Sequence, residues 1–166
     1  MIEKQLTKQT EDAIAVWVAK FPKEQKRSAI LMALRLAQKQ AGWLSDALLD
    51  EVAKLLDLPP IWIYEVAGFY SMYDRKPVGK HKIGICNSIS CGLCGSAQLM
   101  HDLSKRLGIQ VGQTTADGQI TLQELECLGA CCDGPAVMLN ETEYLAKPTT
   151  NQILERIKAL DGETAT

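Results

Sequence analysis

Six cysteines are the residues best able to do chemistry in this sequence of 166 residues, and all of them lie within residues 86–132. Cys86 and Cys91 enclose four residues, whereas Cys127 and Cys131 enclose three. Thiolates from two such segments can bind a tetrahedral zinc ion or a [2Fe–2S] cluster, because soft sulfur ligands suit both. Structural zinc sites favour knuckles with two to four intervening residues, and this chain offers only one two-residue spacing, Cys91 to Cys94. A four-residue gap followed by a distant pair is more typical of a cluster.

A different chemistry is indicated by the segment Cys91-Gly92-Leu93-Cys94. A C-x-x-C between a strand and a helix is typical of thioredoxin-like thiol–disulfide oxidoreductases, in which the helix N-terminus lowers the pKa of the thiol. Pro135 would suit the proline that such folds place beside the redox pair. This hypothesis leaves Cys86, Cys127 and Cys131 unexplained. A thioredoxin-like fold whose thiol site has been replaced by a metal cluster would reconcile the two. The spacing leaves cluster, zinc and thiol chemistry open.

Composition and short motifs exclude several other functions. The 18 basic and 20 acidic residues give a net charge of -2, which lacks the basic surplus of a nucleic-acid binder. Neither of the two histidines lies in a cysteine–histidine ligand motif, and Gly95 follows the C-x-x-C where attached haem would need histidine. No G-x-G-x-x-G follows a predicted strand, so we expect no dinucleotide site on this chain.

The sequence also predicts a cytosolic location. The polar and charged residues 1–8 lack the apolar core of an export signal, and no apolar run approaches the roughly 18 residues that span a bilayer. In a reducing cytosol, cysteines point to metal binding or thiol chemistry rather than to structural disulfides.

The cysteine-free first half predicts a small antiparallel bundle of helices. Apolar residues recur at helical spacing, with Gly42 as a helix stop, Ser45 as an N-cap, and Pro59 and Pro60 between two helices. The expected helices are 11–19, 30–41, 45–56 and 60–67. Short connections between them favour antiparallel packing.

The second half predicts a two-layer α/β domain that follows a linker at residues 74–80. Its first expected elements are a strand at 82–86 and a helix that is opened by Gly92 and Gly95 and ends at Leu107. A hairpin turn at Asp117-Gly118 with a returning strand at 120–125 should follow. The last expected elements are strands at 136–139 and 143–145 and a final helix with a capping box at Thr149 and Gln152. We expect the domain boundary between residues 78 and 79.

Five motifs taken together resemble the small [2Fe–2S] subunits of NADH:quinone oxidoreductases, the respiratory complex I enzymes. They are Gly68-Phe69-Tyr70-Ser71-Met72-Tyr73, Arg75-Lys76-Pro77-Val78-Gly79, Cys86-x4-Cys91, Glu126-Cys127-Leu128-Gly129-Ala130-Cys131, and Pro135. In the bacterial enzymes this component is the E subunit. The resemblance runs from about Ala29 to Leu160. Related proteins are diaphorase subunits of NAD-linked hydrogenases and formate dehydrogenases.

The resemblance implies an N-terminal helical bundle followed by a thioredoxin-like [2Fe–2S] ferredoxin domain. It implies that Cys86, Cys91, Cys127 and Cys131 bind the cluster. It also implies an electron-transfer role beside a flavin-bearing partner that carries FMN and oxidises NADH, so that the isolated chain has no complete active site. Other peripheral-arm subunits would be further partners, and contact with the cytoplasmic side of the inner membrane would come only through the complex.

Two cysteines depart from that family's pattern. Cys94 and Cys132 stand where relatives commonly have other residues, and the choice of Cys131 over its neighbour as a ligand comes from the resemblance. We expect both extra thiols to be buried hydrophobic fillers. Around the ligands, Gly92, Gly95 and Gly129 are either N–H donors that approach sulfur or ordinary turn glycines.

The basic residues near the linker also admit two interpretations. They could dock an acidic partner surface, although a solvated linker is the expectation that we prefer. These residues are Arg75, Lys76, Lys80 and Lys82.

Overall fold

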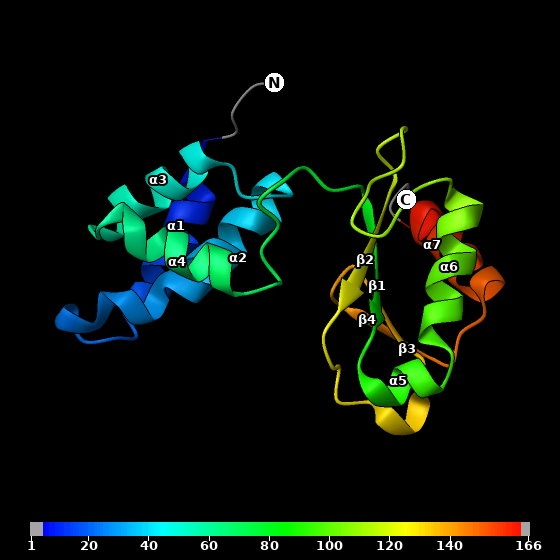
Figure 1. The fold of residues 1–166 in the computed structure, drawn as a ribbon. Coiled ribbons are helices and arrows are strands. Elements are labelled where there is room, and N and C mark those ends of the chain that lie inside the picture. The colour runs from blue at the N-terminus through cyan, green and yellow to red at the C-terminus, as the bar shows by residue number, and fades with distance from the viewer. Residues whose placement is uncertain (1–4, 164–166) are drawn as a thin grey trace. The chain divides into compact units, whose positions relative to one another are not determined.

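A computed structural model describes residues 5–163 and divides the chain into two compact units, Met1–Pro77 and Val78–Thr166 (Figure 1). The division falls one residue before the boundary that the sequence suggests. Within residues 5–163, none of the helices combines the length and the apolar character needed to cross a bilayer.

The first unit consists of helices, and we call it the helical unit. Its elements are α1 (Lys8–Val18), the 3-10 helix η1 (Lys23–Ala29), α2 (Ile30–Ala41), α3 (Asp46–Leu56) and α4 (Pro60–Phe69). The signals read from the sequence act as expected: Gly42 closes α2 in the left-handed region at φ 91°, and the Ser45 hydroxyl accepts a hydrogen bond from Leu48 N–H. The sequence did not predict η1, because its charged residues show no apolar periodicity.

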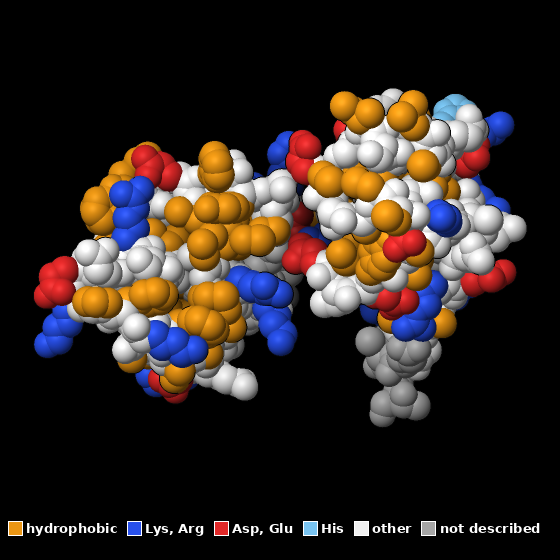
Figure 2. All heavy atoms as spheres, turned by 90° about the horizontal axis from the view of Figure 1, so that it is seen from below, with side chains coloured by type: hydrophobic (Ala, Val, Ile, Leu, Met, Phe, Trp, Pro, Cys, Tyr) orange, Lys and Arg blue, Asp and Glu red, His pale blue; other side chains and the backbone are white. Residues whose placement is uncertain are grey.

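Aliphatic side chains from all four α-helices form the core of the helical unit, which includes Ile14, Ile30, Leu34, Leu49, Val52 and Ile63. Other apolar side chains of this unit stay exposed, and Figure 2 shows them gathered over its surface. Phe69 is 81% exposed, and its ring stacks edge-on against Tyr70 at 5.0 Å between centroids. A solvated aromatic cluster of this kind is typical of a protein-binding surface.

The predicted linker is shorter than expected, because its first residues belong to the helical unit. Asp74 N–H donates to the side chain of Gln38, and its carbonyl accepts from Leu44 N–H. Arg75 forms an ion pair of 2.5 Å with Asp46. The interpretation of Arg75 as a solvated linker residue is therefore wrong.

The second unit, which we call the ferredoxin-like unit, has a four-stranded sheet with the order β2-β1-β3-β4. Its elements are β1 (His81–Cys86), α5 (Ile89–Leu93), α6 (Ser96–Leu107), β2 (Ile120–Leu125), the 3-10 turn η2 (Cys131–Asp133), β3 (Ala136–Leu139), β4 (Glu143–Ala146) and α7 (Thr150–Glu163). β1 and β2 are parallel, whereas β3 is antiparallel to both β1 and β4.

One face of the sheet packs against α6 and α7, which lie on the same side in Figure 1. Ile83 and Ile85 of β1 point to this face and meet Leu103 of α6 and Ile153 of α7. The expected two-layer α/β arrangement is therefore confirmed. The predicted capping box is present too, since Gln152 N–H donates to the Thr149 hydroxyl and the Gln152 side chain accepts from Thr149 N–H.

Two details of this unit differ from the sequence-based expectation. The turn at Asp117-Gly118 forms, but the strand that follows pairs in parallel with β1, and its link to the preceding segment is an isolated bridge between Thr114 and Thr121. The expected helix up to Leu107 consists of two helices, because Gly95 adopts φ 97° and interrupts the helical conformation between α5 and α6. Both differences come from long-range pairing or local backbone geometry that apolar periodicity does not encode.

A buried histidine joins the start of β1 to the end of α7. His81 is 3% exposed, and its Nδ1 accepts from the Asn140 amide, so its Nε2–H donates to Asp161 at 2.9 Å. Lys80 pairs with the same carboxylate at 2.5 Å. The His81 hydrogen bond and the Lys80 charge hold the pKa of Asp161 below its ordinary value, against the opposing effect of burial.

We predict that Asp161→Asn destabilises the protein near neutral pH and loses this effect in acid. A carboxyl whose folded-state pKa is lowered stabilises the fold above its unfolded pKa of about 3.9, and this contribution is lost as the pH falls through the folded-state pKa. Melting temperatures measured from pH 7 to pH 3 should therefore converge for the wild type and the variant. Glu155→Gln, on the same helix, is the control and should show no such convergence.

Candidate metal centre

The parallel pairing of β1 with β2 places the two cysteine segments at one edge of the sheet. Cys86, the last residue of β1, lies opposite Leu125, the last residue of β2. Asn87 N–H donates to the Leu125 carbonyl at 3.0 Å and extends this pairing beyond the strands. The loop that begins at Glu126 therefore starts beside Cys86 and α5.

Cys86 is buried, and both cysteine segments supply donors to its sulfur. Its side chain accepts backbone hydrogen bonds from Ser88, on its own loop, and from Leu128, on the loop after β2. Burial raises the pKa of the Cys86 thiol, but these N–H donors and the Cys91 thiol outweigh burial, so the pKa lies below its ordinary value. The hydrogen-bond donors around Cys86 therefore oppose the effect of burial on its thiol, although the residue is only 1% exposed.

Cys91 lies on α5 with its side chain buried against the start of β3. Ala136 N–H donates to its sulfur and lowers the pKa of the thiol, but burial and the neighbouring Cys86 sulfur together raise it further, so the net shift is upward. The Cys131 thiol acts on Cys91 electrostatically in the same direction. Three of the four predicted ligands thus interact, and they compete for negative charge as closely grouped thiolates do.

The loop after β2 carries Cys127 and Cys131, and both are exposed. Gly129 N–H donates to the Cys127 sulfur at 3.4 Å, and its φ of 73° is a conformation that favours glycine. Gly129 is therefore an N–H donor to sulfur, as one of the two interpretations held. Gly92 and Gly95 instead form backbone bonds to carbonyls of α5 and its cap.

The expectation that both extra thiols are buried fillers is wrong. Cys94 and Cys132 are exposed, like two of the predicted ligands. Cys94 caps the C-terminus of the five-residue helix α5, and Cys132 lies in the short turn η2. Both elements are short and lie at the edge of the sheet, so hydrophobicity alone could not determine the burial of these side chains.

The residues at this edge fit a [2Fe–2S] cluster. All six cysteines are free thiols, and backbone N–H groups point at the sulfurs of Cys86, Cys91 and Cys127, as anionic sulfur requires. Among residues 5–163 no three His, Cys, Asp or Glu side chains are arranged to bind a single ion. A [2Fe–2S] cluster needs no such group, because it takes two protein ligands on each iron.

The thiol–disulfide hypothesis finds less support in the same geometry. A reactive pair needs an accessible thiol with a lowered pKa at its first cysteine. Here Cys91 is 2% exposed and the pKa of its thiol is raised, whereas the accessible thiol is Cys94 at the C-terminus of α5.

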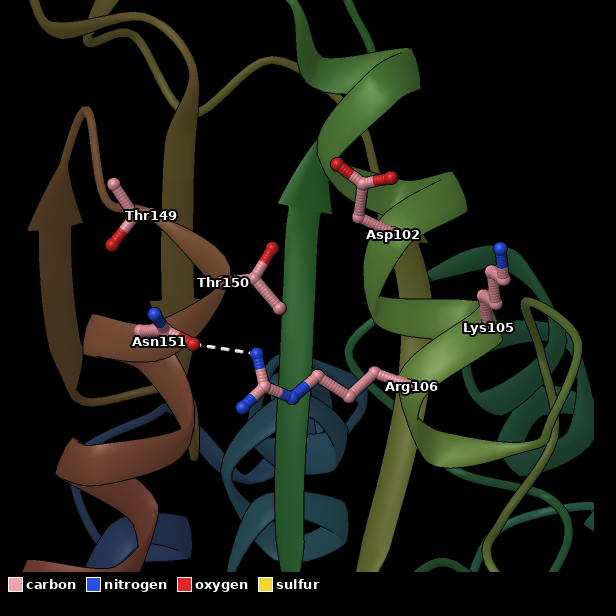
Figure 3. A pocket seen from close by; sticks show the side chains of 6 residues that line it. All are labelled: Asp102, Lys105, Arg106, Thr149, Thr150 and Asn151. Atoms are coloured by element: carbon pink, nitrogen blue, oxygen red, sulfur yellow. Dashed lines mark hydrogen bonds between the residues drawn. The ribbon is translucent and has the colours of Figure 1, made fainter.

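A pocket of the ferredoxin-like unit lies apart from the cysteines, between α6 and the start of α7 (Figure 3). Arg106 reaches across it and donates to the Asn151 side chain at 2.5 Å. The other lining residues are Asp102, Lys105, Thr149 and Thr150. Charges of both signs line this pocket, and its two facing polar groups bind each other.

Comparison with known protein families identifies the fold. Residues 14–161 match the family model described as thioredoxin-like [2Fe–2S] ferredoxin. The chain is 43% identical over 141 residues to the E subunit of the NADH-quinone oxidoreductase of Rickettsia felis, with 84% of this chain and 83% of the relative covered. It is 37% identical over 156 residues to the E subunit numbered 2 of the Rhizobium meliloti NADH-quinone oxidoreductases, with 93% and 92% covered.

Two further similarities involve longer proteins. The mitochondrial NADH dehydrogenase [ubiquinone] flavoprotein 2 of Dictyostelium discoideum is 40% identical over 144 residues, but this match covers 85% of our chain and only 58% of the relative. A solved structure of an NAD+-reducing [NiFe]-hydrogenase in the air-oxidized state superposes with a TM-score of 0.65 at 25% identity, over 76% of this chain and 23% of the other.

The different exposure of the thiols leads to a prediction for the iron-free protein. Under native conditions iodoacetamide should modify Cys94 and Cys132 quickly and Cys86 and Cys91 slowly, because the first two are accessible to solvent and the last two are buried. Peptide mass spectrometry after timed labelling measures this order. Labelling in denaturant should make the rates equal, and rapid native labelling of Cys91 would contradict the described burial.

Proposed function

Since the chain belongs to the thioredoxin-like [2Fe–2S] ferredoxin family, we propose that it is the small electron-transfer subunit of an NADH:quinone oxidoreductase. The observation that carries the proposal is the convergence of the two cysteine segments: Cys86, which ends β1, lies opposite Leu125, which ends β2 and precedes Cys127 by two residues. Asn87 N–H extends this pairing by donating to the Leu125 carbonyl at 3.0 Å. The bacterial relatives, matched over most of their own length, support the assignment to this enzyme.

In this proposal the cluster ligands are Cys86, Cys91, Cys127 and Cys131. When bound, a [2Fe–2S] cluster accepts and releases one electron at a time. The task of the chain is to hold the four ligand sulfurs in place and to limit the access of water to the cluster. The two buried cysteines are packed against Leu128, Ala130 and Ala136. The low local dielectric that such packing creates, together with N–H donors to sulfur, tunes the reduction potential of a cluster.

The proposal assigns the remaining chemistry to partners. A flavin-bearing subunit would bind FMN and NADH and deliver electrons singly, while other peripheral-arm subunits would connect the assembly to the cytoplasmic side of the inner membrane. Exposed apolar residues support docking to protein: Ile89 and Leu93 of α5 are 84% and 86% exposed beside the proposed ligands. The basic residues Lys80 and Lys82 contribute less, because they pair with Asp161 and Glu141.

A second assembly is supported by one observation. The similarity to an NAD+-reducing [NiFe]-hydrogenase fits a diaphorase subunit of a hydrogenase, and a formate dehydrogenase would need the same module. Both alternatives retain the cluster and the flavin partner and differ in the other subunits.

We predict that the chain purified without oxygen contains about two irons and two sulfides, the composition of the cluster. Replacing any one of Cys86, Cys91, Cys127 or Cys131 by Ala should abolish most of this content, because one iron would lose a thiolate. Iron and acid-labile sulfide assays with visible and EPR spectra measure the effect.

The matched control is Cys132→Ala, which replaces an exposed thiol next to Cys131 and should retain the cluster. Stoichiometric zinc without visible absorbance in the wild type would refute the cluster. Loss of the cluster in Cys132→Ala but not in Cys131→Ala would refute the ligand assignment.

A second prediction concerns the partner. Affinity purification of the tagged chain from its native cells should recover a flavin-containing subunit that reduces artificial acceptors with NADH. Co-purified membrane subunits of a quinone-reducing enzyme support the proposal, whereas a hydrogenase large subunit or a formate dehydrogenase would replace it by the alternative. Recovery of the chain with no flavoprotein would contradict both.

A further inference from the structure

The residue of the C-x-x-C segment that remains without a role is Cys94. Cys91 lies in α5, and Cys94, three residues later, is the C-cap of the same helix. The two side chains therefore lie on the same side of this helical segment. Both meet the chain that leads into β3, and Figure 1 shows α5 beside the loop between β2 and β3. Cys91 receives the N–H of Ala136, whereas Cys94 meets Gly134 two residues earlier.

The Cys94 side chain leaves little space for a side chain at position 134. A Cβ built on Gly134 would lie 3.3 Å from both Cβ and Sγ of Cys94, and 3.6 Å from the carbonyl oxygen of Cys131. The backbone at Gly134 has φ -66° and ψ 144°, which every residue type adopts without strain. Space, and not backbone conformation, is therefore what favours glycine here.

This contact lies next to a proposed ligand. Gly134 ends the turn η2, whose first residue is Cys131. On its other side the turn is fixed by Lys147 N–H, which donates to the Asp133 carbonyl at 3.1 Å. A change in the spacing between Cys94 and Gly134 would consequently shift a short segment that is held at one end, and Cys131 would move with it.

We propose that Cys94 is a positioning residue for the metal centre: its side chain packs against Gly134 and thereby sets the place of the Cys131 sulfur. In this proposal the C-x-x-C segment is not a redox pair: Cys91 is a cluster ligand and Cys94 is a positioning residue, and both face the segment 134–136. The inference rests on the proposed cluster, since Cys131 has a sulfur to position only if it is a ligand.

The test is a cycle of four full-length proteins: the wild type, Gly134→Ala, Cys94→Gly and the double variant. Gly134→Ala should lose iron to a chelator about tenfold faster, as is typical when a residue that orients a ligand is disturbed. It should also shift the EPR g-values and the midpoint potential of the molecules that retain the cluster. Cys94→Gly should broaden the EPR signal, because the turn loses its support.

The double variant decides between positioning and simple destabilisation. Removing the Cys94 side chain vacates the space that the new methyl group needs, so the double variant should resemble the wild type more than either single variant does. Gly92→Ala is the matched control: it lies on α5, a Cβ there meets nothing within 4 Å, and its cluster should be unchanged. A merely destabilised protein would lower the melting temperature without moving the g-values.

Two results would overturn the inference. The first is a Gly134→Ala protein with the wild-type EPR signal and iron-release rate, and the second is a defect that persists unchanged in the double variant. A wild-type chain without iron and sulfide would instead refute the proposed function, and this inference with it. The iron and sulfide content of the wild type therefore distinguishes a failure of the proposed function from a failure of this inference.

Discussion

The ferredoxin-like unit depends on the parallel pairing of β1 with β2. Because parallel neighbours end at the same edge, this pairing brings Cys86 and the loop after Leu125 together, although 39 positions separate the two partners Cys86 and Leu125 in the register. The covering helices α6 and α7 bury one face of the sheet and leave this edge free for the cysteine segments. Without the pairing, the two cysteine pairs would lie on unconnected loops and no shared site would exist.

The second constraint is electrostatic. Sulfur ligands that are buried in a low dielectric need hydrogen-bond donors or a cation, because burial alone disfavours the thiolate. The chain supplies backbone N–H groups from Ser88, Leu128, Gly129 and Ala136, so the donors come from the loops themselves and need no charged side chain. The N–H of Ala136 lowers the pKa of the Cys91 thiol, but burial and the adjacent Cys86 sulfur raise it, so two neighbouring thiolates disfavour each other. Positive charge from bound metal would relieve that conflict.

The two units differ in the functional residues that they contain. The ferredoxin-like unit contains every candidate ligand, whereas the helical unit has a complete aliphatic core and an exposed aromatic cluster around Phe69 and Tyr70. The basic residues near the boundary do not form a free positive patch, since Arg75, Lys80 and Lys82 pair with carboxylates within their own units. Apolar contacts therefore remain the better candidates for binding a partner subunit.

The sequence by itself determined the features that depend on near neighbours. Gly42, Ser45 and Thr149 act as the caps they were expected to be, because a cap involves residues within one helical turn. It also predicted the helical first half, the strands at 136–139 and 143–145, and the grouping of the cysteines, whose joint motifs pointed to the right family. Only the tertiary structure decided the strand partner of Ile120–Leu125, the exposure of Cys94 and Cys132, and the contact of Cys94 with Gly134. These features depend on residues far apart in the chain, and their energies come from packing and pairing that no local pattern records.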